Sequence, residues 1–140
     1  PEIPADDVED VDLIDVSVMN QLEADVGAEA VSTLVGKFLD DARSRLGRVS
    51  AETEMPRHDI EREIHSVGSS AATFGAQRLE RRARDLEHDC RAGRSFEEID
   101  FHRRLVALNG ILAETEQAFR KAYAAADPGA ASGLSRQAGE

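Results

Sequence analysis

Residues 60–75 read IEREIHSVGSSAATFG, and apolar residues recur in this run at spacings of four, three, four and three. The recurring residues are Ile60, Ile64, Val67, Ala71 and Phe74. This is the period of an α-helix that buries one apolar stripe. The spacing therefore predicts a helix that packs against a core along that stripe.

One histidine lies beside this stripe. His65 directly follows a stripe residue, and helix geometry therefore places it about 100° away, at the boundary between the buried and the solvent-facing sides. The residues one and two turns later on the same side are small, namely Gly68, Ser69 and Ala72. Small neighbours leave a ring uncovered. A glycine inside a helix costs about 1 kcal/mol relative to alanine, so Gly68 requires a structural reason.

Two helices are predicted before this run. A short apolar cluster over residues 13–22 favours a small leading helix, with Ser17 as its N-cap and Gly27 as its end. From residue 28 to residue 49 the apolar residues keep to one face, which predicts a long amphipathic helix. Pro56 then ends that helix or starts the next one.

Two more helices are predicted after a chain reversal at Gly75, since glycine readily takes the left-handed conformation that closes a helix. The first runs from Ala76 to Gly93. The second starts at a capping box formed by Ser95 and Glu98. Its apolar seam alternates spacings of four and three through Phe101, Leu105, Leu108, Leu112, Thr115, Phe119 and Ala122.

These elements predict an all-α fold. Short connections and the lack of a strand pattern favour an antiparallel up-down-up-down four-helix bundle with a short extra N-terminal helix, over residues 13–126. Residues 1–12 are acidic and polar, as is typical of a disordered tail or linker. Residues 127–140 are rich in alanine, serine and glycine and predict a disordered C-terminal tail.

The composition narrows the classes of function. A chain of 140 residues is long enough for one domain with a single hydrophobic core. Its net charge of −11 argues against nucleic acid or an anionic membrane surface as a partner, although seven of the acids lie in the first 15 residues. The single cysteine, Cys90, excludes an intramolecular disulfide and fits a reducing compartment. Without a signal-peptide pattern or an apolar run long enough to insert into a membrane, we expect a cytoplasmic location.

The reversal at Gly75 also predicts which residues face each other. His65 lies ten residues before it, so residues about ten after it, Arg84 to Glu87, should run alongside. Arg91 stands one turn beyond Glu87 on the same side. A carboxylate near the ring could hold the Nδ1 proton and present Nε2 as a nucleophile. An arginine nearby could stabilise added negative charge.

The run from residue 65 to residue 87 resembles the signature of histidine-containing phosphotransfer (HPt) domains of bacterial multistep phosphorelays. That signature reads H-x-x-K-G-x-x-x-x-x-G-x-x-x-L, with a leucine-glutamate pair further on. The matching residues here are His65, Gly75, Leu79, Leu86 and Glu87. Where the family usually has lysine and its first glycine, this chain has Gly68 and Ser69, so the usual cation is absent.

The resemblance implies a phosphorelay intermediate. His65 would accept a phosphoryl group from a receiver-domain aspartate or a kinase and pass it to a response-regulator aspartate. The implied partners are a receiver domain and a sensor histidine kinase, of the hybrid kind or not, and we expect a monomer. No cofactor is implied for this chain, because magnesium belongs to the receiver. The chain has no G-x-x-x-x-G-K-[ST] loop, so we expect no ATP-dependent kinase activity of its own.

The resemblance also assigns roles to residues around the histidine. Glu87 is the candidate that orients the ring, and Arg91, with Arg62 as a second choice, is the candidate that replaces the lysine. The expected docking face for the receiver consists of Arg62, Gly68, Ser69, Ala72 and Arg84.

Two other readings stay open. The bundle could be a non-catalytic adaptor or dimerisation module in which His65 is inert. It could also be a metal-carboxylate enzyme, but such bundles use paired E-x-x-H motifs, and here only Asp85-x-x-His88 comes close, on one helix. His58, His88 and His102 carry no motif and are interpreted as structural or merely exposed.

Overall fold

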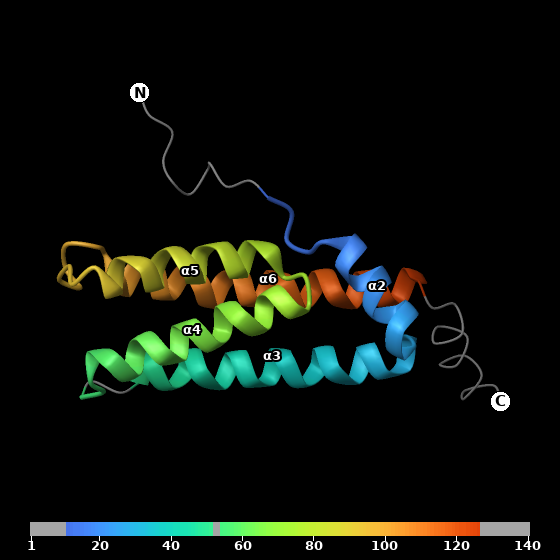
Figure 1. Ribbon diagram of the computed structural model, residues 1–140, viewed down its shortest axis with the longest axis horizontal. Helices are drawn as coiled ribbons and strands as arrows, with labels where there is room; N and C mark the ends of the chain where they lie inside the picture. Colours follow the sequence, from blue (N-terminus) through green and yellow to red (C-terminus); the bar gives the residue numbers. More distant parts are fainter. Residues whose placement is uncertain (1–10, 52–53, 127–140) are drawn as a thin grey trace, which may run out of the picture.

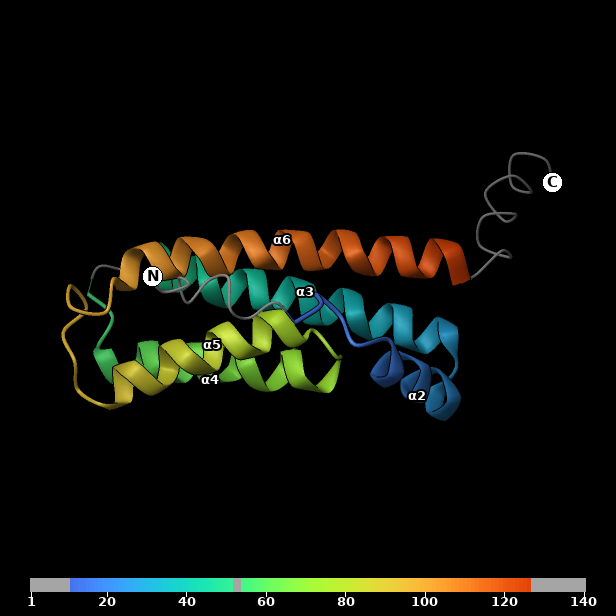
Figure 2. The ribbon, with the colours of Figure 1, turned by 90° about the horizontal axis from the view of Figure 1, so that it is seen from above.

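The computed structural model describes residues 11–51 and 54–126, and within them it contains helices and no strand. The helices are α2 (Val16–Val26), α3 (Ala28–Ala51), α4 (Arg57–Thr73), α5 (Gln77–Arg91) and α6 (Phe101–Ala126). Helices α3 to α6 alternate in direction along the long axis of the molecule (Figure 1). Helix α2 lies at one end of the bundle, beside the start of α3 (Figure 2). The predicted all-α bundle with a short leading helix is confirmed.

The core consists of the apolar stripes that the sequence pattern identifies. On α4, Ile60, Ile64, Val67 and Ala71 are all buried, each with at most 6% of its surface exposed. The seam of α6 is buried from Phe101 to Phe119, including the hydroxyl of Thr115, which donates to the carbonyl of Ile111 at 2.7 Å. Because these stripes meet in one cluster, the backbone around His65 is fixed by packing on its buried side.

The cap of α2 differs from the prediction. The N-cap is Asp15, whereas Ser17 lies inside the first turn. The Asp15 carboxylate accepts hydrogen bonds from the Ser17 backbone N–H at 3.0 Å and from its hydroxyl at 2.7 Å. These bonds lower the pKa of Asp15, because they favour its charged form. Serine and aspartate are both good caps, and the nearby aspartate is the one with extended backbone.

The capping box also forms, but it does not begin the last long helix as predicted. Glu98 accepts from the backbone N–H of Ser95 at 3.2 Å, and the Glu98 N–H donates to the Ser95 hydroxyl at 3.0 Å. The box stabilises a separate turn over residues 96–100. Asp100 then takes a left-handed conformation, with φ of 57°, and interrupts the helical path. Helix α6 therefore starts at Phe101.

Gly75 joins the turn between α4 and α5 to the leading segment. Its φ is +74°, the left-handed conformation expected at this reversal. The Gly75 carbonyl accepts a hydrogen bond from the Asp15 backbone N–H at 2.7 Å. A Cβ at Gly75 would lie only 3.0 Å from the Cβ of Val18 and 3.1 Å from the carbonyl oxygen of Asp15. Glycine is thus required twice here, for its backbone conformation and for the close approach of α2.

We expect Gly75→Ala to lower the free energy of unfolding by about 2 to 3 kcal/mol, from left-handed strain and from the contact with Val18. The matched control is Gly93→Ala. Gly93 has a similar φ of +79°, but nothing lies within 4 Å of the added Cβ, so only the strain is present. Urea unfolding followed by circular dichroism should show a clearly larger loss for Gly75→Ala. Equal losses in the two variants would contradict the close packing of α2.

The predicted tails lie outside the described residues, except for residues 11 and 12, which are described and non-helical.

Cys90 is buried, and burial raises the pKa of its thiol. In the part of the chain that the structure describes, no helix has the length and apolar character needed to cross a membrane.

Candidate functional site

The site lies on the antiparallel pair α4 and α5, which packs closely because the facing residues are small. Ala71 and Ala83 are fully buried between the helices. Gly68 is buried too, and a Cβ there would lie 3.6 Å from the Cβ of Ala83 and 3.3 Å from the Cγ of Arg84. The stem of Arg84 therefore lies across Gly68. This contact gives the structural reason for a glycine in the middle of α4.

His65 projects from α4 with one ring nitrogen held and its side chain 55% exposed. Its Nδ1 lies 2.9 Å from Oε2 of Glu87, the neighbour predicted from the reversal at Gly75. The Glu87 side chain is only 10% exposed. An ionised carboxylate can only accept hydrogen bonds, so this contact favours a proton on Nδ1, and in the neutral ring Nε2 then keeps its lone pair. In that neutral tautomer the ring presents the lone pair of Nε2.

Nε2 faces the next turn of α4. The hydroxyl of Ser69 lies 3.4 Å from it, at the long end of hydrogen-bonding distance. Ser69 is exposed, and its hydroxyl can rotate away from the ring. Nε2 therefore points along α4 toward Ser69, on the exposed side of the ring.

Arg91 forms an ion pair with Glu87, the residue whose carboxylate contacts the ring of His65. Its Nη2 lies 2.9 Å from Oε2 of Glu87, the same oxygen that binds His65. A carboxylate with so little exposure needs a compensating charge, and the guanidinium provides it from α5 itself. The result is a chain of contacts from Arg91 through Glu87 to the ring of His65.

The comparison with protein families agrees with this geometry. The family model described as Hpt domain matches residues 33–135, which is most of the chain. The chain belongs to the Hpt domain family. This family carries out histidine phosphotransfer in phosphorelays and interacts with partners such as receiver domains and kinases. No curated protein and no solved structure matches the chain.

The remaining site residues predicted for this Hpt domain lie around the ring in different ways. Arg62 and Ser69 are exposed, and Ala72 is half-buried. Arg84 is exposed and forms an ion pair with Glu80, Nη1 to Oε2, at 3.1 Å. Gly68 is buried with the stem of Arg84 across it, so it contributes little surface to the expected docking face. The sequence reasoning missed Glu80, although its spacing of four from Arg84 is the spacing of a helical ion pair.

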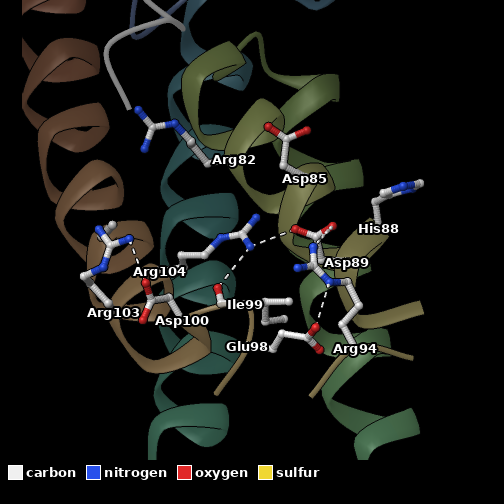
Figure 3. A pocket seen from close by; sticks show the side chains of 11 residues that line it. Arg82, Asp85, His88, Asp89, Arg94, Glu98, Ile99, Asp100, Arg103 and Arg104 are labelled. Atoms are coloured by element: carbon white, nitrogen blue, oxygen red, sulfur yellow. Dashed lines mark hydrogen bonds and ion pairs between the residues drawn. The ribbon is translucent and has the colours of Figure 1, made fainter. Parts of the chain in front are cut away.

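A second feature of this Hpt domain is a charged hollow of about 520 Å³ between α5, the segment 94–100 and α6 (Figure 3). Several of its charges form ion pairs with one another. Arg104 lies 2.8 Å from Asp89, and Arg103 lies 3.1 Å from Asp100. Asp85 and His88, which resembled half of a metal motif, both line the hollow. Within residues 11–51 and 54–126 no group of three or more His, Cys, Asp or Glu could hold a metal ion.

Proposed function

We propose that this Hpt domain is a phosphorelay intermediate that accepts a phosphoryl group on Nε2 of His65 from a receiver-domain aspartate or a kinase, and passes it to a response-regulator aspartate. The observation that carries the proposal is the 2.9 Å contact between Nδ1 and the nearly buried Glu87, on a ring that is otherwise half-exposed. A ring held on one nitrogen and open at the other is arranged to act as a nucleophile.

The phosphoryl transfer requires no cofactor bound to this chain. The Nε2 lone pair attacks phosphorus, the N–P bond forms, and the P–O bond of the aspartyl phosphate breaks to release the aspartate carboxylate. The proton on Nδ1 stays in place, so the phosphorylated ring carries a positive charge. Glu87 stabilises that charge as it develops, which lowers the barrier in both directions. Magnesium would be held by the receiver, as is usual in phosphoryl transfer to or from an aspartate pocket.

Arg91 has two roles in this proposal. Its ion pair with Glu87 sets the position of the carboxylate, and its charge adds to the positive potential around the phosphoryl group. The receiver would dock on the face of α4 around the ring, formed by Arg62, Ser69 and Ala72, with Arg84 at its border. We further propose that the domain acts as a monomer in the cytoplasm, with a sensor histidine kinase upstream.

The experiment that tests the proposal is phosphotransfer from receiver domains of the same organism, each labelled on its aspartate. After incubation with the 140-residue chain, label that is acid-labile and base-stable, and that mass spectrometry locates on His65, would support the proposal. If none of the labelled receivers loses its phosphoryl group to the chain, and phosphoramidate does not label it either, the adaptor reading replaces the relay.

A Glu87→Gln variant should transfer the phosphoryl group about tenfold more slowly. Glutamine keeps the size and can still accept from Nδ1, but a neutral acceptor gives up the extra strength of a charge-assisted hydrogen bond, about 1.4 kcal/mol here. The rate of label appearance on His65 measures the effect. Asp85→Asn removes an exposed acid from the same helix and serves as the control. Equal rates for Glu87→Gln and the control would remove Glu87 from the mechanism.

A further inference from the structure

We propose that Arg84 is the cation that binds the phosphoryl group on His65, reaching it from α5 across Gly68. This inference rests on the proposed function, because it concerns the group that the ring would carry. It starts from a contact in the structure: an added Cβ on Gly68 would lie 3.3 Å from Cγ and 3.7 Å from Nε of Arg84. The stem of Arg84 thus lies directly beside the position from which a side chain at residue 68 would extend.

The direction of the ring favours Arg84 over Arg91. On α4, Nε2 of His65 faces Ser69, toward the reversal at Gly75. Since α4 and α5 are antiparallel (Figure 1), Arg84 lies on that side of Glu87, level with residue 68, and Arg91 lies one turn away on the opposite side. A phosphoryl group on Nε2 would extend toward Arg84. Arg91 is instead bound behind the ring, to the carboxylate that holds Nδ1.

The ion pair between Arg84 and Glu80 is weak enough for Arg84 to leave it for another anion. Its ion pair with Glu80 joins two residues on one helix turn at 3.1 Å, and 53% of the Arg84 side chain is exposed. Such exposed pairs contribute little to stability because water screens them. A phosphoryl group carries more charge and three acceptor oxygens, and a planar guanidinium can bind two of them. We therefore infer that Arg84 leaves Glu80 for the phosphoryl oxygens while its stem stays on Gly68.

The position of Arg84 also explains why this chain does not need a lysine at residue 68. From Cγ of Arg84 to its Nη atoms there are as many bonds as from Cβ of a lysine to its Nζ. Since Cγ of Arg84 lies beside the position of that Cβ, both side chains would bring a cation to the same side of the ring. The buried glycine suits this arrangement, because a Cβ at residue 68 would press on the Arg84 stem at 3.3 Å and a long side chain there would compete with the arginine for space.

The test uses phosphoramidate, a small donor that needs no docking surface, with the full chain. Its P–N bond breaks, ammonia leaves, and the phosphoryl group forms a bond to Nε2. Arg84→Met keeps a long stem over Gly68 and removes the charge, so labelling of His65 should fall about tenfold. Arg84→Lys should retain most of the rate. The double variant Gly68→Lys with Arg84→Ala moves the cation to α4 and should recover most of the loss.

The matched control is Arg103→Met. Arg103 is also an exposed helical arginine with a 3.1 Å ion pair, to Asp100, but it lies on α6, diagonally across the bundle from α4 (Figure 2). Wild-type labelling rates in Arg84→Met, with unchanged helicity, would overturn the role of Arg84 and leave the proposed function intact. An equal loss in Arg103→Met would overturn it as well, because the effect would then be one of net charge. If phosphoramidate does not label the wild-type chain, the same variants are compared with a phosphorylated receiver as donor, and absence of label from both donors would overturn the proposed function and this inference with it.

Discussion

We expect a His65→Gln variant to take up no phosphoryl group, either from a phosphorylated receiver domain or from phosphoramidate, while its helicity and unfolding midpoint should stay close to those of the wild type. The loss is complete because the amide has no nucleophilic nitrogen. The fold is retained because 55% of the His65 side chain is exposed and its contacts lie at the border of the core. Such surface substitutions usually change stability by less than about 0.5 kcal/mol. A glutamine amide can also still donate to Glu87.

The control for this prediction is His88→Gln. His88 is exposed on α5, and in the described part of the chain the ring of His65 is the one histidine ring hydrogen-bonded to a carboxylate. The control should label at the wild-type rate, as measured by acid-labile label and by mass spectrometry. Label that persists in His65→Gln would show that another residue is the acceptor.

Periodicity and one reversal were sufficient to predict the fold and the central contact. The stripe of α4 follows from apolar spacing alone, because a helix can bury only one face against a single core. Counting outward from Gly75 brings residues 84–87 beside His65, since two antiparallel helices of uniform rise place roughly equal distances from the turn side by side. Within that window Glu87 is the residue that contacts the ring.

Other features could not be predicted, because they depend on choices between equivalent local signals. Asp15 and Ser17 are both suitable caps, and the tertiary hydrogen bond from Asp15 to Gly75 is compatible with Asp15 as the cap. The capping box at Ser95 predicts where a helical segment starts but not how long it is. Here the segment is a single turn that ends at Asp100, which has a left-handed backbone conformation. Counting from Gly75 places Arg84 near His65, but it does not predict that the Arg84 stem lies across Gly68, because that path depends on the side-chain conformation.

An Ala72→Trp variant should lose phosphotransfer from the receiver by at least about 100-fold and still accept label from phosphoramidate. Ala72 lies on α4 about two turns beyond His65 and is half-buried, so an indole there would project from the proposed docking face. Transfer needs the phosphorus within about 3 to 3.5 Å of Nε2, and a displacement of about 1 Å can already cost about 100-fold. The small donor needs no such approach, so its reaction separates blocked docking from a damaged site.

The control is Val106→Trp, which places the same bulk on α6, where Val106 is 58% exposed. It should transfer at the wild-type rate, since α6 lies diagonally opposite α4 (Figure 2). Ser69→Trp provides a graded comparison, because Ser69 lies 3.4 Å from Nε2 and an indole there should slow phosphoramidate as well as the receiver. If Ala72→Trp exchanges normally with the receiver while Val106→Trp does not, the receiver docks against α6, and its aspartate must then reach His65 from the α5 side of the ring.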